Sequence, residues 1–89
     1  MINDKENLKK RLIYRSQYRG TKEMDKLLGA FVAKYIKLFN EPQLLKLENF
    51  LNLDDENLYK IYNGLKTEVL IDHDNEIMIL FKKFIYKVK

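Results

Sequence analysis

One short stretch of the chain gathers basic, acidic and glycine residues between two segments of helical pattern. It is the run Arg19-Gly20-Thr21-Lys22-Glu23-Met24-Asp25. An arginine guanidinium can donate paired hydrogen bonds to a carboxylate, so charge-assisted hydrogen bonds are the chemistry that this run offers. The residue types alone favour a local interpretation, a helical corner held by an Arg19–Glu23 pair, because oppositely charged residues four apart commonly pair.

The residue types predict how this corner is built. Gly20 is expected to be its hinge, because glycine adopts positive φ without steric cost. Thr21 is expected to cap the helix that follows. Glu23 and Asp25 then fall in the first turns of that helix, where negative charge suits the positive end of the helix dipole.

The chain offers little for catalysis. It has no cysteine, which excludes a disulfide, a thiolate nucleophile and a cysteine-based metal site. Its one histidine, His73 between Asp72 and Asp74, is a weak metal candidate, because divalent sites usually need more converging ligands. No nucleophile–base pairing, phosphate loop or dinucleotide fingerprint is visible. We therefore predict a binding protein with no catalytic residues and no metal.

Length and composition place the chain in a narrow class. Its 89 residues fit a single domain over 1–89, and its apolar content of 46% argues against disorder. No apolar run approaches the roughly 20 residues of a membrane span. The first residues, Met1–Glu6, resemble neither a signal peptide nor a transit peptide. From these features we expect a soluble protein of a bacterial cytoplasm that does not bind membranes.

Hydrophobic periodicity predicts an all-α fold, a compact bundle of about five helices. The second helix has the widest apolar stripe and is expected to form the central wall of the core, with Gly29 allowing a neighbouring helix to pack closely. Asp54 is expected to cap the fourth helix and Gly64 to end it in a left-handed conformation. The expected helices run from a cap at Asn3 or Asp4 to about Tyr18, then over about 21–39, 42–51 and 55–63, and from a cap at Asp72 or Asp74 to about Val88.

Three arginines recur at four-residue spacing along the first helix and its end: Arg11, Arg15 and Arg19. This spacing places them on one side of a helix, where they repel one another unless something acidic meets them. The acidic group could belong to this chain, whose residues 41–76 are rich in acids, or to a partner. The sequence leaves both interpretations open.

The motif and its surroundings resemble the succinate dehydrogenase assembly factors, small helical proteins with an RGxxE motif that promote covalent flavin attachment. The matching positions are Arg19-Gly20-x-x-Glu23, Met24-Asp25, Leu27-Leu28-Gly29-x-Phe31, Arg11-Leu12-x-Tyr14-Arg15-Ser16 and Asp54-x-x-x-Leu58-Tyr59…Gly64. Two positions depart from the expected pattern, Thr21 in place of a methionine and Ile61 in place of a tryptophan. Both departures are expected to be local variations of core packing or of helix capping.

The resemblance implies a partner and a role. The chain is expected to bind the flavoprotein subunit of succinate dehydrogenase, or the homologous fumarate reductase subunit, and to promote attachment of FAD to a histidine of that subunit. It would hold no stably bound cofactor itself, because FAD acts on the partner. It would not be an enzyme, and it would be a monomer when free.

The resemblance also implies the contact surface. Arg19, Gly20 and Glu23 would form its centre: Arg19 as a donor to a partner carboxylate, Gly20 as a point of close backbone approach, and Glu23 as an acceptor. The second-line contacts would be Arg11, Arg15, Tyr18 and Asp25.

Two other functions compete with this one. A small basic nucleic-acid-binding domain fits the net charge of +4 and the arginine spacing. Against it, Glu23 and Asp25 occupy the leading positions of the helix that would read the nucleic acid. The other alternative is a helical bundle that has no flavoprotein partner.

Overall fold

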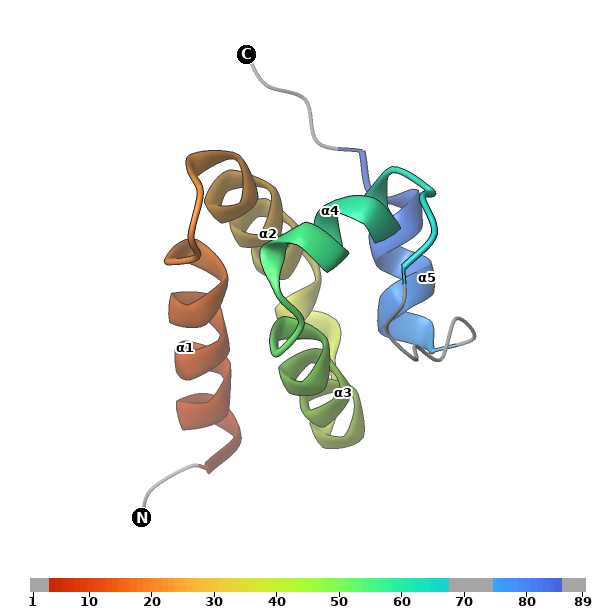
Figure 1. The fold of residues 1–89 in the computed structure, drawn as a ribbon. Coiled ribbons are helices and arrows are strands. Elements are labelled where there is room, and N and C mark those ends of the chain that lie inside the picture. The colour runs from red at the N-terminus through yellow and green to blue at the C-terminus, as the bar shows by residue number, and fades with distance from the viewer. Residues whose placement is uncertain (1–3, 68–74, 86–89) are drawn as a thin grey trace.

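The structure, a computed structural model, describes residues 4–67 and 75–85, which form helices and contain no strand (Figure 1). This confirms the predicted all-α bundle of about five helices. No helix in these ranges is long and apolar enough to cross a bilayer. The helices are α1 (Asp4–Gln17), α2 (Lys22–Tyr35), the short 3-10 helix η1 (Ile36–Leu38), α3 (Glu41–Leu51), α4 (Asp55–Tyr62) and α5 (Glu76–Lys83).

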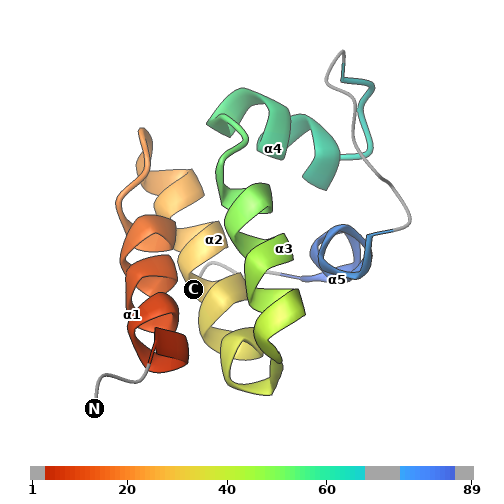
Figure 2. The same ribbon diagram turned by 90° about the horizontal axis from the view of Figure 1, so that it is seen from below.

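The first three α-helices lie side by side, with α5 on the far side of α3 from α1 (Figures 1 and 2). The α4 helix crosses the end of this layer where α3 stops, so the α1–α2 loop and the α3–α4 loop lie at the same end (Figure 2). A side-chain carbon on Gly29 would lie 3.3 Å from Cγ of Gln17, so the glycine allows α1 and α2 to approach closely, as predicted.

Three residues predicted to cap or end the helices do so in the structure. Thr21 Oγ1 accepts a hydrogen bond from the backbone N–H of Met24 at 3.2 Å, and Asp54 Oδ1 accepts one from Asn57 at 3.0 Å. Each bond satisfies a backbone donor that the first turn of a helix leaves free. Gly64 follows α4 with a φ of +72°. These three predictions are confirmed.

The last helix is shorter than predicted. Its N-cap is Asn75, whose side chain accepts from the backbone N–H of Ile77; the expected caps, Asp72 and Asp74, lie outside the described residues. The helix ends at Lys83, and Phe84 is extended with φ −71° and ψ 126°. This backbone returns the Phe84 ring to the core, where it is 8% exposed, and so the predicted continuation of the helix through Phe84 is wrong.

Phe31 on α2 is the centre of the hydrophobic core. It is fully buried, and its ring lies 5.2 Å from that of Phe81 and 5.5 Å from that of Phe84, measured between centroids. The Phe50 ring on α3 lies 5.9 Å away. The Phe81 and Phe84 rings meet the Phe31 ring edge to face, an arrangement that stabilises a core beyond the area that it buries. The predicted central role of the second helix is confirmed.

A polar contact joins the start of α5 to α3. The Glu76 carboxylate accepts from Gln43 at 3.1 Å and from Lys46 at 3.0 Å. The hydrogen bond from Gln43 and the hydrogen bond and charge of Lys46 lower the pKa of Glu76. A carboxylate with a lowered pKa in the folded state binds its proton more readily when the chain is unfolded.

This linkage predicts a pH dependence for the α3–α5 contact. The stabilisation from Glu76 is present above the unfolded pKa, about 4.3, and is lost as the pH falls through the lower folded value. We expect the thermal midpoint of the wild type to fall more than that of Glu76→Gln between about pH 5 and about pH 3. Circular dichroism melts of both proteins across this range measure it, and parallel pH profiles would contradict it.

Candidate functional site

Arg19 ties the α1–α2 loop to the end of α3 and the start of α4. Its Nε donates to Asp55 Oδ1 at 2.7 Å, and Nη1 donates to the backbone oxygen of Leu51, also at 2.7 Å. Its Nη2 donates to the backbone oxygen of Leu53. The side chain is only 11% exposed. The donors of the planar guanidinium are therefore engaged by acceptors of this same chain.

Gly20 extends this contact through its backbone. Its N–H donates to the second carboxylate oxygen of Asp55 at 3.0 Å, and a side-chain carbon on Gly20 would lie 3.2 Å from that oxygen. Within the described ranges only Gly64 has a positive φ, so the predicted hinge role of Gly20 is wrong. A glycine suits this position because the Asp55 carboxylate lies against the backbone, where a side chain would crowd it. We call these three residues, Arg19, Gly20 and Asp55, the corner clamp.

Asp25 closes the corner from the other side. Its Oδ1 accepts a hydrogen bond from the backbone N–H of Arg19, and its own N–H donates to the Thr21 carbonyl at 3.0 Å. The carboxylate therefore bends the loop back onto the first turn of α2.

Glu23 is the exception among the acids and bases of this corner. The predicted Arg19–Glu23 pair is wrong, because Asp55, 36 residues further along the chain, takes the guanidinium instead. Glu23 is exposed, and its carboxylate makes no hydrogen bond or ion pair with the rest of the described chain. Its carboxylate is thus available to a partner.

Each of the three arginines has a side-chain partner on α3 or just beyond its end. Arg11 and Arg19 form ion pairs with acids of the 41–76 region, which confirms the interpretation that this chain supplies the acids for them. Arg15 meets a neutral amide, and the Arg11 side chain stays 59% exposed. Two of the three arginines in the stripe that motivated a nucleic-acid-binding function therefore already have an acidic partner in this chain. The partners are Glu48 for Arg11, Asn52 for Arg15 and Asp55 for Arg19.

Tyr18 adds an exposed aromatic surface beside the corner. It is 67% exposed, and its ring centroid lies 4.5 Å from that of Tyr14, which is 63% exposed. Contact of a partner with Tyr18, and with the other residues predicted for the surface, remains a prediction.

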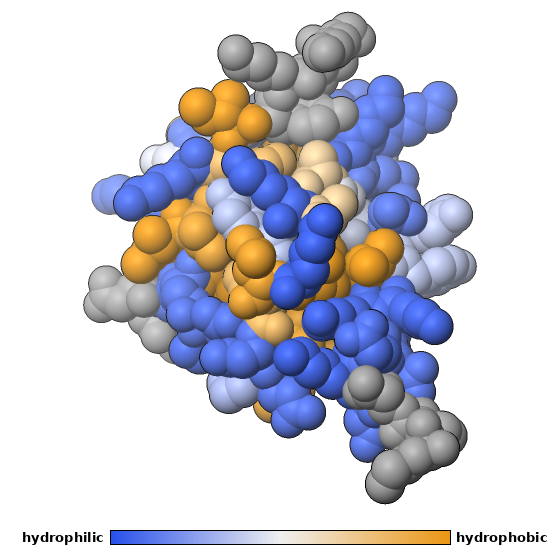
Figure 3. Space-filling view, turned by 180° about the vertical axis from the view of Figure 1, so that it is seen from behind, coloured by the Kyte–Doolittle hydropathy of each residue, from blue (hydrophilic) through white to orange (hydrophobic). Residues whose placement is uncertain are grey.

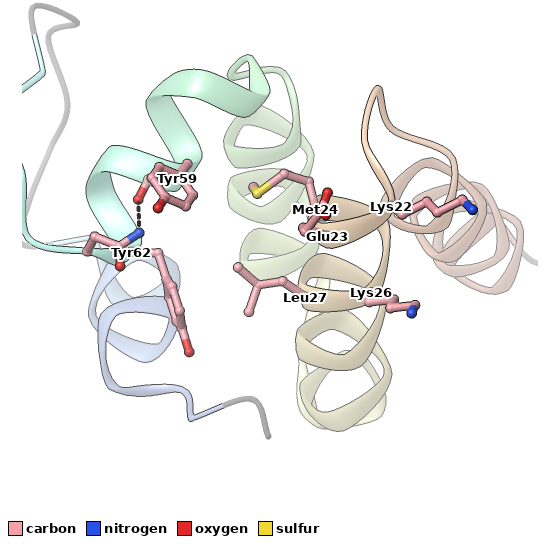
Figure 4. Close-up of a pocket in the computed structure, with 8 residues that line it drawn as sticks. Lys22, Glu23, Met24, Lys26, Leu27, Tyr59 and Tyr62 are labelled. Atoms are coloured by element: carbon pink, nitrogen blue, oxygen red, sulfur yellow. Dashed lines mark hydrogen bonds between the residues drawn. The ribbon is translucent and has the colours of Figure 1, made fainter. Parts of the chain in front are cut away.

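A groove runs between the start of α2 and α4 (Figure 4). One hollow of about 400 Å³ reaches the end of α4, and another of about 430 Å³ reaches the start of α4 and Asp55. Glu23, Met24 and Tyr59 line both hollows. We call the two together the α2–α4 groove. The first is also lined by Lys22, Lys26, Leu27, Tyr62 and Asn63, and the second by Thr21, Asp55 and Glu56.

The described residues contain no cluster of three or more histidine, cysteine or acidic side chains that could hold a metal ion. The sequence-based candidate, His73 with Asp72 and Asp74, lies outside the described residues.

Comparison with known proteins decides the family. A sequence profile described as flavinator of succinate dehydrogenase matches residues 10–85. The chain belongs to this flavinator family. The resemblance drawn from the sequence is thereby confirmed at the level of the family.

Two relatives show the extent of the match. Succinate dehydrogenase assembly factor 2-B, mitochondrial, of Drosophila willistoni is 36% identical over 81 residues, which cover 90% of this chain and 52% of that protein. Succinate dehydrogenase assembly factor 2, mitochondrial, of Saccharomyces cerevisiae is 44% identical over 63 residues, covering 70% of this chain and 39% of that protein. This flavinator chain spans about half the length of such relatives or less. No solved structure matches it.

Both relatives are named as mitochondrial proteins. The prediction of a bacterial cytoplasm, which rested on the composition and on the first residues, is overturned by these names. They point to mitochondria instead.

Asp55 is the residue that sequence reasoning missed. The sequence marked this region only as the beginning of a helix, after the cap at Asp54. The flavinator match covers the whole region but singles out no contact within it. The only signal in the sequence for the Arg19–Asp55 pair was that both residues lie beside predicted helix ends.

Proposed function

We propose that this chain binds the flavoprotein subunit of succinate dehydrogenase and promotes covalent attachment of FAD to a histidine of that subunit. Membership of the flavinator family supports the role, and the flavoprotein is the subunit to which a flavin would be attached. In this proposal FAD is bound by the partner. The homologous fumarate reductase subunit is a partner of the same kind.

One observation supports the choice of Glu23 as the residue that contacts the partner. Around Glu23, the functional groups of Arg19, Gly20 and Asp25 are all engaged within the chain, while the Glu23 carboxylate is exposed and unpaired among the described residues. An ion of this kind on a rigid corner is preorganised for a donor on another protein. Glu23 is therefore the direct contact in this proposal, and Arg19 acts by holding the corner in shape.

The chain needs no catalytic group for this role. The flavin supplies the chemistry of attachment, and a bound protein accelerates it by holding the flavin and the histidine of the flavoprotein in a reactive arrangement. Arg11, Arg15 and Tyr18 lie along α1 and at its end, where they would extend the contact outward from the corner.

Replacing Glu23 by alanine tests the proposal. Loss of a charge-assisted hydrogen bond of about 1.5–3 kcal/mol should weaken binding, and with it covalent flavin at limiting factor, by roughly tenfold or more. The flavoprotein subunit is co-expressed with the wild type, with the variant or with no factor. Flavin fluorescence in a denaturing gel, divided by the amount of flavoprotein, is the measurement.

Glu41→Ala is the matched control for this experiment. Glu41 is also an exposed acid in the first turn of a helix, but that helix is α3, which begins at the opposite end of the layer (Figure 2). We expect the control to keep wild-type flavinylation. If the wild type gave no more covalent flavin than the sample without factor, the function would be refuted. If Glu23→Ala matched the wild type, the assignment of Glu23 would be refuted.

A further inference from the structure

We propose that the α2–α4 groove binds an extended segment of the flavoprotein subunit in which a basic residue and a large apolar residue stand two positions apart. The basic side chain would enter the hollow at the start of α4, and the apolar side chain would enter the hollow at its end. This inference rests on the proposed function for the identity of the partner. It goes further by stating which kind of residue meets Glu23 and by assigning Tyr59 to the contact.

The hollow at the start of α4 is acidic. Its described lining includes three carboxylates, those of Glu23, Asp55 and Glu56, and no basic side chain. The charge of Asp55 is compensated by Arg19, whose Nε lies 2.7 Å from it. Glu23 has no such partner in the described ranges, so its negative charge can attract a cation from another protein.

Glu56 adds a second carboxylate that an incoming cation can contact. It pairs with Lys60 on the same helix at 3.2 Å, but its side chain is 75% exposed. A solvated pair of this kind contributes little, so Glu56 can exchange it for a contact with the occupant. Glu23 from α2 and Glu56 from α4 would then face the same basic side chain from the two walls of the groove.

The hollow at the end of α4 has apolar walls. Met24 and Leu27 extend from α2 toward α4, and Tyr59 and Tyr62 face them from α4 (Figure 4). Tyr59 is 57% exposed, which is a large exposure for an aromatic ring beside an apolar wall. Such rings are enriched at protein interfaces, and a methionine adapts to side chains of different shape. This hollow therefore suits a large apolar side chain.

Two lysines border the apolar hollow, but they point out of it. Lys22 and Lys26 belong to its lining, and in Figure 4 their side chains extend away from Tyr59 and Tyr62. Their positive charge is therefore directed out of the groove, whereas Glu23 lines both hollows. An anionic occupant would meet the Glu23 carboxylate in either hollow, which disfavours a phosphate-bearing ligand such as a free flavin nucleotide.

The geometry of the groove sets the spacing of the two side chains. The hollows share Glu23, Met24 and Tyr59, so they continue into one another along α4. The acidic end reaches Glu56, and the apolar end reaches Tyr62, about 9 Å further along α4 at 1.5 Å per residue. In an extended segment, side chains two positions apart point to the same side and are separated by roughly 6.6 Å. One such pair fits within this length, whereas adjacent side chains point to opposite sides.

Exposed apolar area alone does not identify a docking site on this molecule. On the face seen in Figure 3, hydrophobic residues gather around the middle, and hydrophilic residues lie between and around them. The α2–α4 groove is distinguished by the Glu23 carboxylate, which is unpaired among the described residues and lies beside the apolar wall of Met24 and Leu27. A charge at a defined place next to an apolar wall gives specificity for one kind of sequence.

The corner clamp keeps the groove open without a partner. Asp55 is the first residue of α4, and it holds both Arg19 and the backbone N–H of Gly20, which precede α2. The distance between the starts of the two helices is therefore fixed by charge-assisted hydrogen bonds. A groove that is formed in advance binds without the cost of ordering its walls.

The first test compares the affinities of variants for the purified apo-flavoprotein subunit of succinate dehydrogenase. Tyr59→Ala should raise the Kd at least about tenfold, because it truncates a central aromatic contact. Leu45→Ala is its control, because Leu45 on α3 is 54% exposed and lies outside the groove. Equal affinities for these two variants would overturn the inference.

Charge reversal tests the sign of the charge on the occupant. Glu23→Lys should raise the Kd by more than about tenfold, because it sets a positive charge against the basic residue of the segment. Glu41→Lys is the control, since it changes the net charge equally at an exposed acid of α3, which begins at the opposite end of the layer (Figure 2). Binding by Glu23→Lys that is as tight as that of Glu41→Lys, or tighter, would contradict a basic occupant.

An aromatic photo-crosslinking amino acid at position 59 of the full chain identifies the occupant. We expect the crosslinked flavoprotein peptide to contain a basic residue two positions from a large apolar one. Replacing that basic residue by glutamate should weaken binding to the wild-type chain and restore binding to Glu23→Lys. A crosslink to a second copy of this chain, a peptide without such a pair, or a failure of the exchanged charges to restore binding would each refute the assignment.

The failure of this inference can be told apart from failure of the proposed function. If the wild-type chain bound the flavoprotein and raised its covalent flavin while Tyr59→Ala behaved like the wild type, only the groove assignment would fail. If the wild-type chain did not bind the flavoprotein at all, both would fail. Circular dichroism of each variant checks its fold, and restored binding of Glu23→Lys to the altered flavoprotein requires that this variant is folded.

Discussion

Replacing Arg19 by alanine is expected to lower the free energy of unfolding by about 3 kcal/mol. The substitution removes the ion pair with Asp55, whose side chain is 22% exposed, and leaves that carboxylate without its counter-charge. It also removes the donors for the carbonyls of Leu51 and Leu53 at the end of α3. Urea denaturation followed by far-UV circular dichroism measures the change.

Arg11→Ala is the matched control for Arg19→Ala. Arg11 is an arginine of the same stripe and pairs with Glu48 at 2.9 Å, but its side chain is 59% exposed. A solvated pair of this kind contributes only about 0–1 kcal/mol. We therefore expect a clear difference between the two variants. Equal losses of stability would contradict the structural role assigned to the corner clamp.

This contrast separates two residues that a motif places together. Arg19→Ala should lose stability, whereas Glu23→Ala should stay within about 0.5 kcal/mol of the wild type, because Glu23 is an exposed residue without a described partner. In the proposed function Glu23→Ala nevertheless loses flavinylation. In that case both residues are needed for the same surface: Arg19 stabilises the fold of the corner, and Glu23 contacts the partner.

The parts of the fold that the sequence predicted correctly depend on local chemistry. The caps at Thr21 and Asp54 and the left-handed Gly64 each require only the few residues next to them. The central role of α2 followed from apolar residues at helical spacing, since such a stripe must be buried. Packing then placed Phe31 in the middle of the core.

The parts that sequence reasoning missed depend on segments brought together by packing. Arg19 was predicted to pair with Glu23 because the two are close in sequence, yet α3 and α4 supply better acceptors at the same end of the layer. Gly20 was expected to adopt a positive φ, and instead its missing side chain leaves room for the Asp55 carboxylate. Periodicity also extended α5 too far, because Phe84 reaches the core from an extended backbone as well.

Replacing Phe31 by alanine is expected to destabilise the fold by about 3–5 kcal/mol. The ring is fully buried, and aromatic residues of α3 and α5 surround it, so a cavity would open where α2, α3 and α5 meet. A domain of this size has a total stability of roughly 5–15 kcal/mol, so the variant could be partly unfolded at room temperature. Urea denaturation and native-state hydrogen exchange measure the change.

Leu38→Ala is the control for Phe31→Ala, because Leu38 is 75% exposed on the neighbouring η1 and its loss should cost less than about 0.5 kcal/mol. Hydrogen exchange adds a finer expectation. The α5 helix is held at its start by Glu76 and along its length by Phe81, which contacts the Phe31 ring. Its amides should therefore lose more protection than those of α1, whereas a uniform loss over both helices would show that Phe31 stabilises the whole bundle equally.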